Sequence, residues 1–175
     1  MPASTIAHRT ERLFIAFWPD EVVQKQLAIH VRQWRLPDPC VQYQSADWHA
    51  TLHFIGPVNV DRIPELAAQL DVPWQPFVWV LDQPQLWAHG LAVLCPRDVP
   101  EALNKLHDQL VHQLHWLNLP VDSRPYRPHV TLARRAATAI PPTSVIPVVW
   151  QVHQFALVVS ARDTRQRYRI ICQFG

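Results

Sequence analysis

The stretch HATLHFIG at residues 49–56 decides the fold, because its first half returns in the second half of the chain as HVTL at residues 129–132. Each copy has the pattern His-x-Thr-Leu. Residues 50–55 form an apolar run that Gly56 and Pro57 close, which is typical of a β-strand. The two copies therefore predict two equivalent strands, one in each half of the chain.

Each motif places an imidazole beside a hydroxyl, because alternate side chains of a strand share a face. His49 and Thr51 point one way, as do His129 and Thr131, while the intervening apolar residues point toward the core. His53 shares the parity of His49 and Thr51. It is expected either to line the same face or to hold a structural position.

Two such walls facing each other would surround a phosphate with two hydroxyl donors and two groups that exchange protons near neutral pH. A neutral histidine could take a proton from an attacking water, while a protonated one gives a proton to the departing oxygen. The pair of motifs favours phosphodiester hydrolysis without a metal ion. The alternative is two unrelated strand histidines, each hydrogen-bonded within the core.

The apolar and turn patterns of the remaining chain predict an α+β fold. We expect two pseudo-symmetric lobes of antiparallel sheet with outer helices, facing across a central cleft in a single bilobal domain over residues 1–175. A Pro-rich connection spans residues 141–147. The predicted strands are 13–17, 41–43, 77–81, 85–87, 91–95, 152–160 and 167–174, and the predicted helices are 19–34, 60–70 and 99–117.

Composition restricts the classes of partner. A net charge of +2 over 175 residues is too small for wrapping a long nucleic-acid backbone, so contact with RNA should be local, as at one terminal phosphate. Cys40, Cys95 and Cys172 are odd in number and widely spaced, which favours free thiols in a reducing compartment. No signal-peptide pattern or apolar stretch of ~20 residues occurs, so the expectation is a cytoplasmic monomer without membrane contact.

Three stretches resemble a known family: RLFIA at 12–16, HATLHFIG at 49–56 and YRPHVTLAR at 126–134. The sequence resembles the two-histidine (2H) phosphoesterases, in particular the bacterial RNA 2′,3′-cyclic phosphodiesterases once called 2′-5′ RNA ligases. The resemblance implies a bilobal fold that holds a phosphate between the motifs, and it implies no cofactor. It also implies His49 as general acid toward the 3′ oxygen and His129 as general base for water, giving a 2′-phosphate.

The same resemblance implies that Thr51, Thr131 and a basic residue just after the second motif bind the phosphate. Arg134 matches that basic position. Simple strand parity turns Arg134 away from His129, so the role requires the strand to end or bulge there. Arg135 is the substitute, and a surface arginine is the structural alternative.

Aromatic residues near the motifs are candidates for stacking on a nucleobase. Phe14, Phe54 and Tyr126 are the first choices, with Trp18 and Trp48 as further candidates. The alternative for each is a place in the core. Trp18 stands where relatives more often carry an acidic or aliphatic residue.

The substrate expected from the resemblance is RNA with a 2′,3′-cyclic phosphate end, such as a tRNA half, or a nucleotide. When a 5′-hydroxyl replaces water, the same chemistry joins ends through a 2′-5′ bond. Alternatives are a cyclic phosphate on ADP-ribose, a 2′-5′ oligoadenylate, or a module that binds RNA ends without turnover. No metal site is expected, since Asp108, His112 and His115, although spaced for metal binding, fit a solvated helix face.

Overall fold

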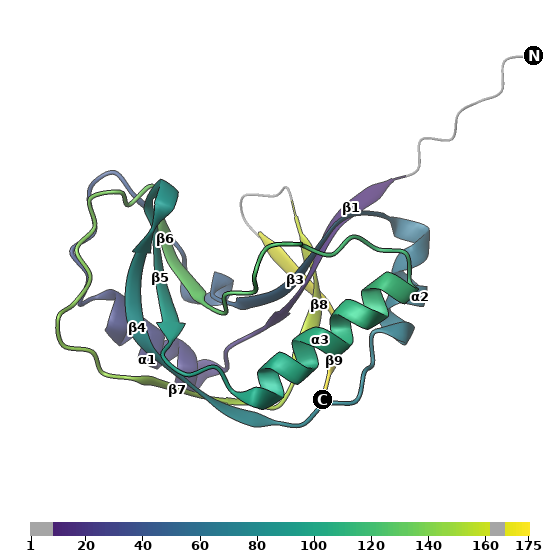
Figure 1. The fold of residues 1–175 in the computed structure, drawn as a ribbon. Helices are drawn as coiled ribbons and strands as arrows, with labels where there is room; N and C mark the ends of the chain where they lie inside the picture. The colour runs from purple at the N-terminus through teal and green to yellow at the C-terminus, as the bar shows by residue number, and fades with distance from the viewer. Residues whose placement is uncertain (1–8, 162–166) are drawn as a thin grey trace, which may run out of the picture.

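The computed structural model describes residues 9–161 and 167–175, which form two antiparallel sheets (Figure 1). One sheet has the order β3-β1-β8-β9 and the other β2-β6-β5-β4-β7. The first contains β1 (Thr10–Phe17), β3 (Ala50–Asn59), β8 (Phe155–Ser160) and β9 (Tyr168–Phe174). The second contains β2 (Val41–Gln42), β4 (Phe77–Trp87), β5 (Leu91–Pro96), β6 (Val130–Arg134) and β7 (Val148–Val152).

Helices flank the two sheets, and each motif strand belongs to a different sheet. The α-helices are α1 (Glu21–Val31), α2 (Ile63–Gln69) and α3 (Glu101–Trp116), and short 3-10 turns are η1 (Ser45–Asp47), η2 (Val60–Arg62) and η3 (Ala88–Gly90). The last two strands return to the N-terminal sheet, where β8 pairs with β1. The predicted α+β fold of two facing antiparallel sheets is confirmed.

Residues 77–87 form one strand, whereas the sequence predicted two. An irregularity at Asp82 bends β4, so that its first part pairs with β7 and its second part with β5. The pairing with β7 ends at Leu81, so at Pro84 the strand is paired only with β5. Proline has no N–H to donate, and such a position with one free side accommodates it. The apolar pattern breaks at Asp82, where the register shifts and the pairing with β7 has ended.

The strand predicted over residues 152–160 is present but begins at Phe155, and the prediction missed a separate strand just before it. Residues 148–152 form β7, and the chain turns at residues 153–154 before β8 begins. Burial alternates along β7, with Val148, Trp150 and Val152 inside. The sequence signal was this alternation, which the neighbouring prolines at 141, 142 and 147 concealed.

A single main core joins the two sheets. Phe17 of β1 is fully buried, and its ring centroid lies 5.7 Å from that of Phe77 and 6.0 Å from that of Trp79, both on β4. It lies 6.3 Å from Trp150 of β7. Phe17 is therefore a direct link between the sheet that contains β3 and the sheet that contains β6.

All three cysteines are free thiols, and Cys95 is buried. No helix among the described residues has the length and apolar character needed to cross a membrane.

Replacing Phe17 with alanine should lower the free energy of unfolding by about 3–5 kcal/mol, because the cavity would open between the sheets. Urea unfolding followed by tryptophan fluorescence measures the change. Trp116→Ala is the control, since that side chain is 67% exposed and its loss should change stability by less than about 0.5 kcal/mol. Equal effects of the two substitutions would contradict the role given to Phe17.

A two-histidine candidate active site

The two motif strands come together from different sheets. Cα atoms of β3 and β6 approach within 8 Å of each other. His49, Thr51, His129 and Thr131 are all partly exposed, whereas Ala50, Leu52, Val130 and Leu132 are buried. The parity predicted from the sequence therefore holds across each His-x-Thr unit, and we call these four polar residues the two-histidine site.

Both motif strands contain an extra residue at the same position, the leucine. In β3, Thr51 pairs with Ala16 and His53 with Ile15, which leaves Leu52 without a partner in the register. In β6, Thr131 pairs with Val93 and Ala133 with Ala92, which leaves Leu132 as the extra residue. Each is a β-bulge, which reverses the facing of the residues directly after it.

In the first motif, the bulge turns His53 away from His49. His53 is 3% exposed, its Nε2 lies 3.0 Å from the carbonyl oxygen of His107 on α3, and the two rings stack at 4.2 Å. Of the two predictions for His53, the structural position is the one observed. The next residue, Phe54, returns to the face of the site, where its ring stacks on that of Phe14 at 5.8 Å.

In the second motif, the bulge brings Arg134 to the face of Thr131. Its guanidinium lies 5.4 Å from the centre of the Tyr43 ring. Phe54 and Arg134 therefore occupy equivalent positions, each five residues after its motif histidine. The bulge that the role of Arg134 requires is present.

Each motif histidine is anchored in the same way by the carbonyl two residues before it. Nδ1 of His49 lies 2.8 Å from the oxygen of Asp47, and Nδ1 of His129 lies 2.7 Å from the oxygen of Arg127. A carbonyl oxygen only accepts, so Nδ1 must carry the proton in both rings. Nε2 of each neutral imidazole is then a free base.

Three aromatic rings surround His49. Trp18 lies face to face with it at 5.1 Å and 6°, Tyr168 meets it edge-on at 4.8 Å, and Phe14 lies 5.1 Å away. The pKa of His49 is lowered from 6.5 to about 4, chiefly by burial; the hydrogen bond to the Asp47 carbonyl opposes the shift, and the charges of His129 and Arg134 add to it. His49 is therefore neutral at pH 7 in the unliganded protein.

The surroundings of His129 are different. The Trp87 ring lies 4.4 Å away at 54°, and the guanidinium of Arg127 covers that indole at 4.0 Å. Burial lowers the pKa of His129, and the charge of Arg127 lowers it too, while the hydrogen bond to the Arg127 carbonyl opposes the shift. Aromatic rings enclose His49, whereas His129 lies beside an aromatic ring and a cation.

The structure places the candidate stacking residues differently. Phe14 is buried beneath His49, whereas Phe54 is 54% exposed. Trp48 belongs to the main core. Tyr126 stacks on His107 at 4.1 Å, and its hydroxyl is buried, so its ring packs against α3.

Sequence reasoning missed Tyr43, Trp87, Arg127 and Tyr168. Tyr168 reaches His49 from the far end of the chain, and no local pattern around it indicated this position. Arg127 stood inside the motif-bearing stretch 126–134, so its closeness to His129 was the one signal available. In the described residues, Asp108, His112 and His115 do not form a cluster arranged to hold a metal ion.

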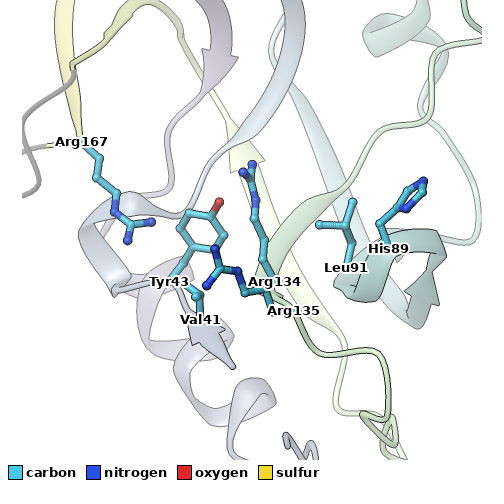
Figure 2. Close-up of a pocket in the computed structure, with 7 residues that line it drawn as sticks. All are labelled: Val41, Tyr43, His89, Leu91, Arg134, Arg135 and Arg167. Carbon is cyan, nitrogen blue, oxygen red and sulfur yellow. The ribbon is translucent and has the colours of Figure 1, made fainter. Parts of the chain in front are cut away.

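A groove of about 710 Å³ opens beside the two-histidine site. Figure 2 shows Tyr43 between Arg167 and the Arg134-Arg135 pair, with His89 and Leu91 beyond that pair. We call it the arginine groove. Its lining residues are Val41, Tyr43, His89, Leu91, Arg134, Arg135 and Arg167.

Solved structures with the same fold include phosphoesterases. A crystal structure of a phosphoesterase superimposes with a TM-score of 0.82 at 22% identity, over 95% of this chain and 98% of that one. Escherichia coli LigT in its apo form gives 0.80 at 22% identity, over 94% and 96%. The protein TT0787 of Thermus thermophilus gives 0.75 at 25% identity, over 93% and 96%. These likenesses show the fold of 2H phosphoesterases.

The sequence comparisons identify the family. The model of the 2′-5′ RNA ligase superfamily matches residues 19–164, and the chain belongs to that superfamily. The RNA 2′,3′-cyclic phosphodiesterase of Escherichia coli strain K12 is 32% identical over 133 residues, which are 74% of this chain and 75% of the relative.

Replacing Trp18 with leucine should raise the pKa of His49 from about 4 toward 6.5, because burial is the largest cause of the lowering and the smaller side chain admits water. Titration of the histidine Cε1 protons by NMR measures this pKa. The pKa of His30 serves as the internal control and should not move, because burial beside Trp34, not Trp18, lowers it to about 4. An unchanged pKa of His49 would show that Trp18 is not what excludes water.

Proposed function

We propose that the chain is an RNA 2′,3′-cyclic phosphodiesterase, which hydrolyses the terminal cyclic phosphate to a 2′-phosphate without a metal ion. One observation carries this proposal: two imidazoles, each fixed through Nδ1, share a site with two threonine hydroxyls. The named activity of the Escherichia coli relative supports the choice of substrate. The chain thus has groups for holding a phosphate and for moving two protons.

The phosphate lies between the motifs in this proposal. The hydroxyls of Thr51 and Thr131 donate hydrogen bonds to its non-bridging oxygens, and Arg134 supplies a guanidinium, which suits a phosphate because two N–H groups can donate in parallel. Phe54 offers an exposed ring, supported from behind by Phe14, for stacking of the terminal base. Tyr126 is already stacked on His107, which favours Phe54 for this role.

The proton transfers follow from the two free Nε2 atoms. His129 takes a proton from water as its oxygen attacks phosphorus, and the bond from phosphorus to O3′ breaks. His49, protonated on Nε2, gives that proton to O3′, leaving a 2′-phosphate and a free 3′-hydroxyl. The negative phosphate raises the pKa of both imidazoles, which favours the protonated acid in the complex.

The physiological substrate proposed is the end of an RNA such as a tRNA half. Crystal structures of Escherichia coli LigT with 3′-AMP and with phosphate support a nucleotide-sized site in that protein. If a 5′-hydroxyl takes the place of water, the same steps form a 2′-5′ bond.

The location proposed for the protein is the cytoplasm, whose reducing conditions are consistent with free thiols. The proposed form is a monomer, because both motifs lie in one chain.

Replacing either motif histidine with alanine should slow the opening of an RNA 2′,3′-cyclic phosphate by at least ~100-fold, because each removes one proton-transfer step. The wild type should keep its rate in excess EDTA and release a 2′-phosphate. Product analysis by phosphorus NMR identifies the terminal phosphate. His53→Gln is the matched control, since that side chain faces α3, and its rate should stay near that of the wild type.

Two outcomes would replace the proposal. Binding of the RNA end without turnover would indicate a clamp, and loss of turnover in EDTA would exclude the metal-independent mechanism. Parallel assays with a cyclic phosphate of ADP-ribose and with 2′-5′ oligoadenylate decide between substrates.

The pH dependence should differ between kcat/KM and kcat. Catalysis needs one protonated and one neutral histidine, and burial lowers both pKa values in the free protein. The maximum of kcat/KM, which reports the free enzyme, should therefore lie below pH 6.5. The maximum of kcat should lie at higher pH, because bound phosphate raises both values. Coincident profiles would show that substrate charge does not tune the histidines.

A further inference from the structure

The arginine groove concentrates positive charge next to the two-histidine site. Three of its lining residues are arginines and none is acidic. Within residues 9–161 and 167–175, no carboxylate lies within 4.0 Å of the Arg134 or Arg135 guanidinium, and Arg167 has only Asp47 at 3.8 Å. Three guanidinium groups that share one carboxylate leave a local excess of positive charge, which favours the binding of an anion.

The aromatic ring of Tyr43 forms the wall between two of these cations. The Arg134 guanidinium lies 5.4 Å and the Arg167 guanidinium 5.3 Å from its centre, within the range of cation–π attraction. Tyr43 itself is 7% exposed and belongs to the main core. A buried ring therefore holds Arg134 from the end of β6 and Arg167, the residue just before β9, on the same groove (Figure 2).

The backbone on the other side is strained and held by a close contact. His89 has φ 62° and Arg135 φ 55°, both in the left-handed region that non-glycine residues rarely adopt. The N–H of Ala136 donates to the oxygen of Gly90 at 2.9 Å, and a Cβ on Gly90 would lie 2.7 Å from the nitrogen of Ala137. The two turns are thus locked together, and this fixes where Arg135 leaves the backbone. Strain of this kind concentrates at functional sites.

We propose that the arginine groove binds the phosphate that precedes the cyclic phosphate, one nucleotide back along the RNA. Arg134 forms the boundary, because it faces the two-histidine site and also lines the groove. A substrate with a 5′-phosphate on its terminal nucleotide, as every RNA chain has, then contacts both sites, whereas a bare nucleoside cyclic phosphate contacts one. This inference rests on the proposed function and specifies its substrate class.

A matched pair of substrates isolates that phosphate: adenosine 2′,3′-cyclic phosphate and the same compound carrying a 5′-phosphate. The wild type should have a kcat/KM roughly ten- to a hundredfold higher for the 5′-phosphorylated compound, as hydrogen bonds to charged groups predict. The double variant Arg135→Asn with Arg167→Gln should lose that preference. Its activity on the compound without the 5′-phosphate should stay within about twofold, since the bulge at Leu132 gives the reacting phosphate to Arg134 and not to its substitute Arg135, and Arg167 has no part in that role.

The variants are chosen to separate charge from folding. Asparagine tolerates positive φ, so Arg135→Asn removes the charge without adding backbone strain. Arg135→Lys keeps the charge and should keep most of the preference. Arg97→Gln removes a cation that pairs with Asp82 outside the groove, and it should leave the preference intact.

Salt dependence gives an independent readout. The preference of the wild type for the 5′-phosphorylated compound should fall as salt rises, because ions screen the attraction between its extra phosphate and the exposed arginines, and the double variant should show no such salt-dependent preference. An unchanged preference in the double variant would overturn the proposal. Equal losses on both substrates would also overturn it, because the arginines would then serve the reacting phosphate.

Failure of the proposed function can be told apart from failure of the groove. If the wild type opened neither compound, the assigned activity would be wrong. Calorimetric binding of adenosine 2′-phosphate and its 5′-phosphorylated form would then decide about the groove. Tighter binding of the second compound that the double variant loses would support the groove, and equal binding would overturn it.

Discussion

A single extra residue in each motif strand determines what the site contains. Without the bulges at Leu52 and Leu132, His53 would lie beside His49, while Phe54 and Arg134 would point toward the core. The bulge instead places an imidazole against α3 and presents an aromatic ring on one strand and a guanidinium on the other. Equivalent backbone geometry thus gives the two walls different chemistry, one suited to a base and one to a phosphate.

The two histidines are also held alike but have different neighbours, and this affects their proton chemistry. Both imidazoles are oriented by a backbone carbonyl two residues earlier, so both present the same nitrogen. Their neighbours differ, because three aromatic rings enclose His49 whereas His129 lies against an indole that carries a guanidinium on its face. A bound phosphate changes this balance, since its charge opposes the burial that keeps both rings neutral.

The small net charge of the protein hides a local concentration of positive charge. A total of +2 argues against wrapping a long nucleic acid, and it conceals three arginines on one groove. Arg134 and Arg135 are adjacent in sequence, but Arg167 joins them only because β9 returns to the N-terminal sheet beside β8. Under the proposal for the arginine groove, affinity for RNA is concentrated at the terminal nucleotide.

The sequence by itself determined the two motif strands, the parity of each His-x-Thr unit, the amphipathic α3 and the two-sheet class, because these follow from periodicity and from motif identity over short ranges. It could not determine the bulges, since register depends on which strand lies alongside. Only the tertiary structure decided that His53 belongs to the core, that β4 is one bent strand, and that Tyr168 and Trp87 flank the histidines. Those contacts join residues far apart in the chain, and no local pattern carries that information.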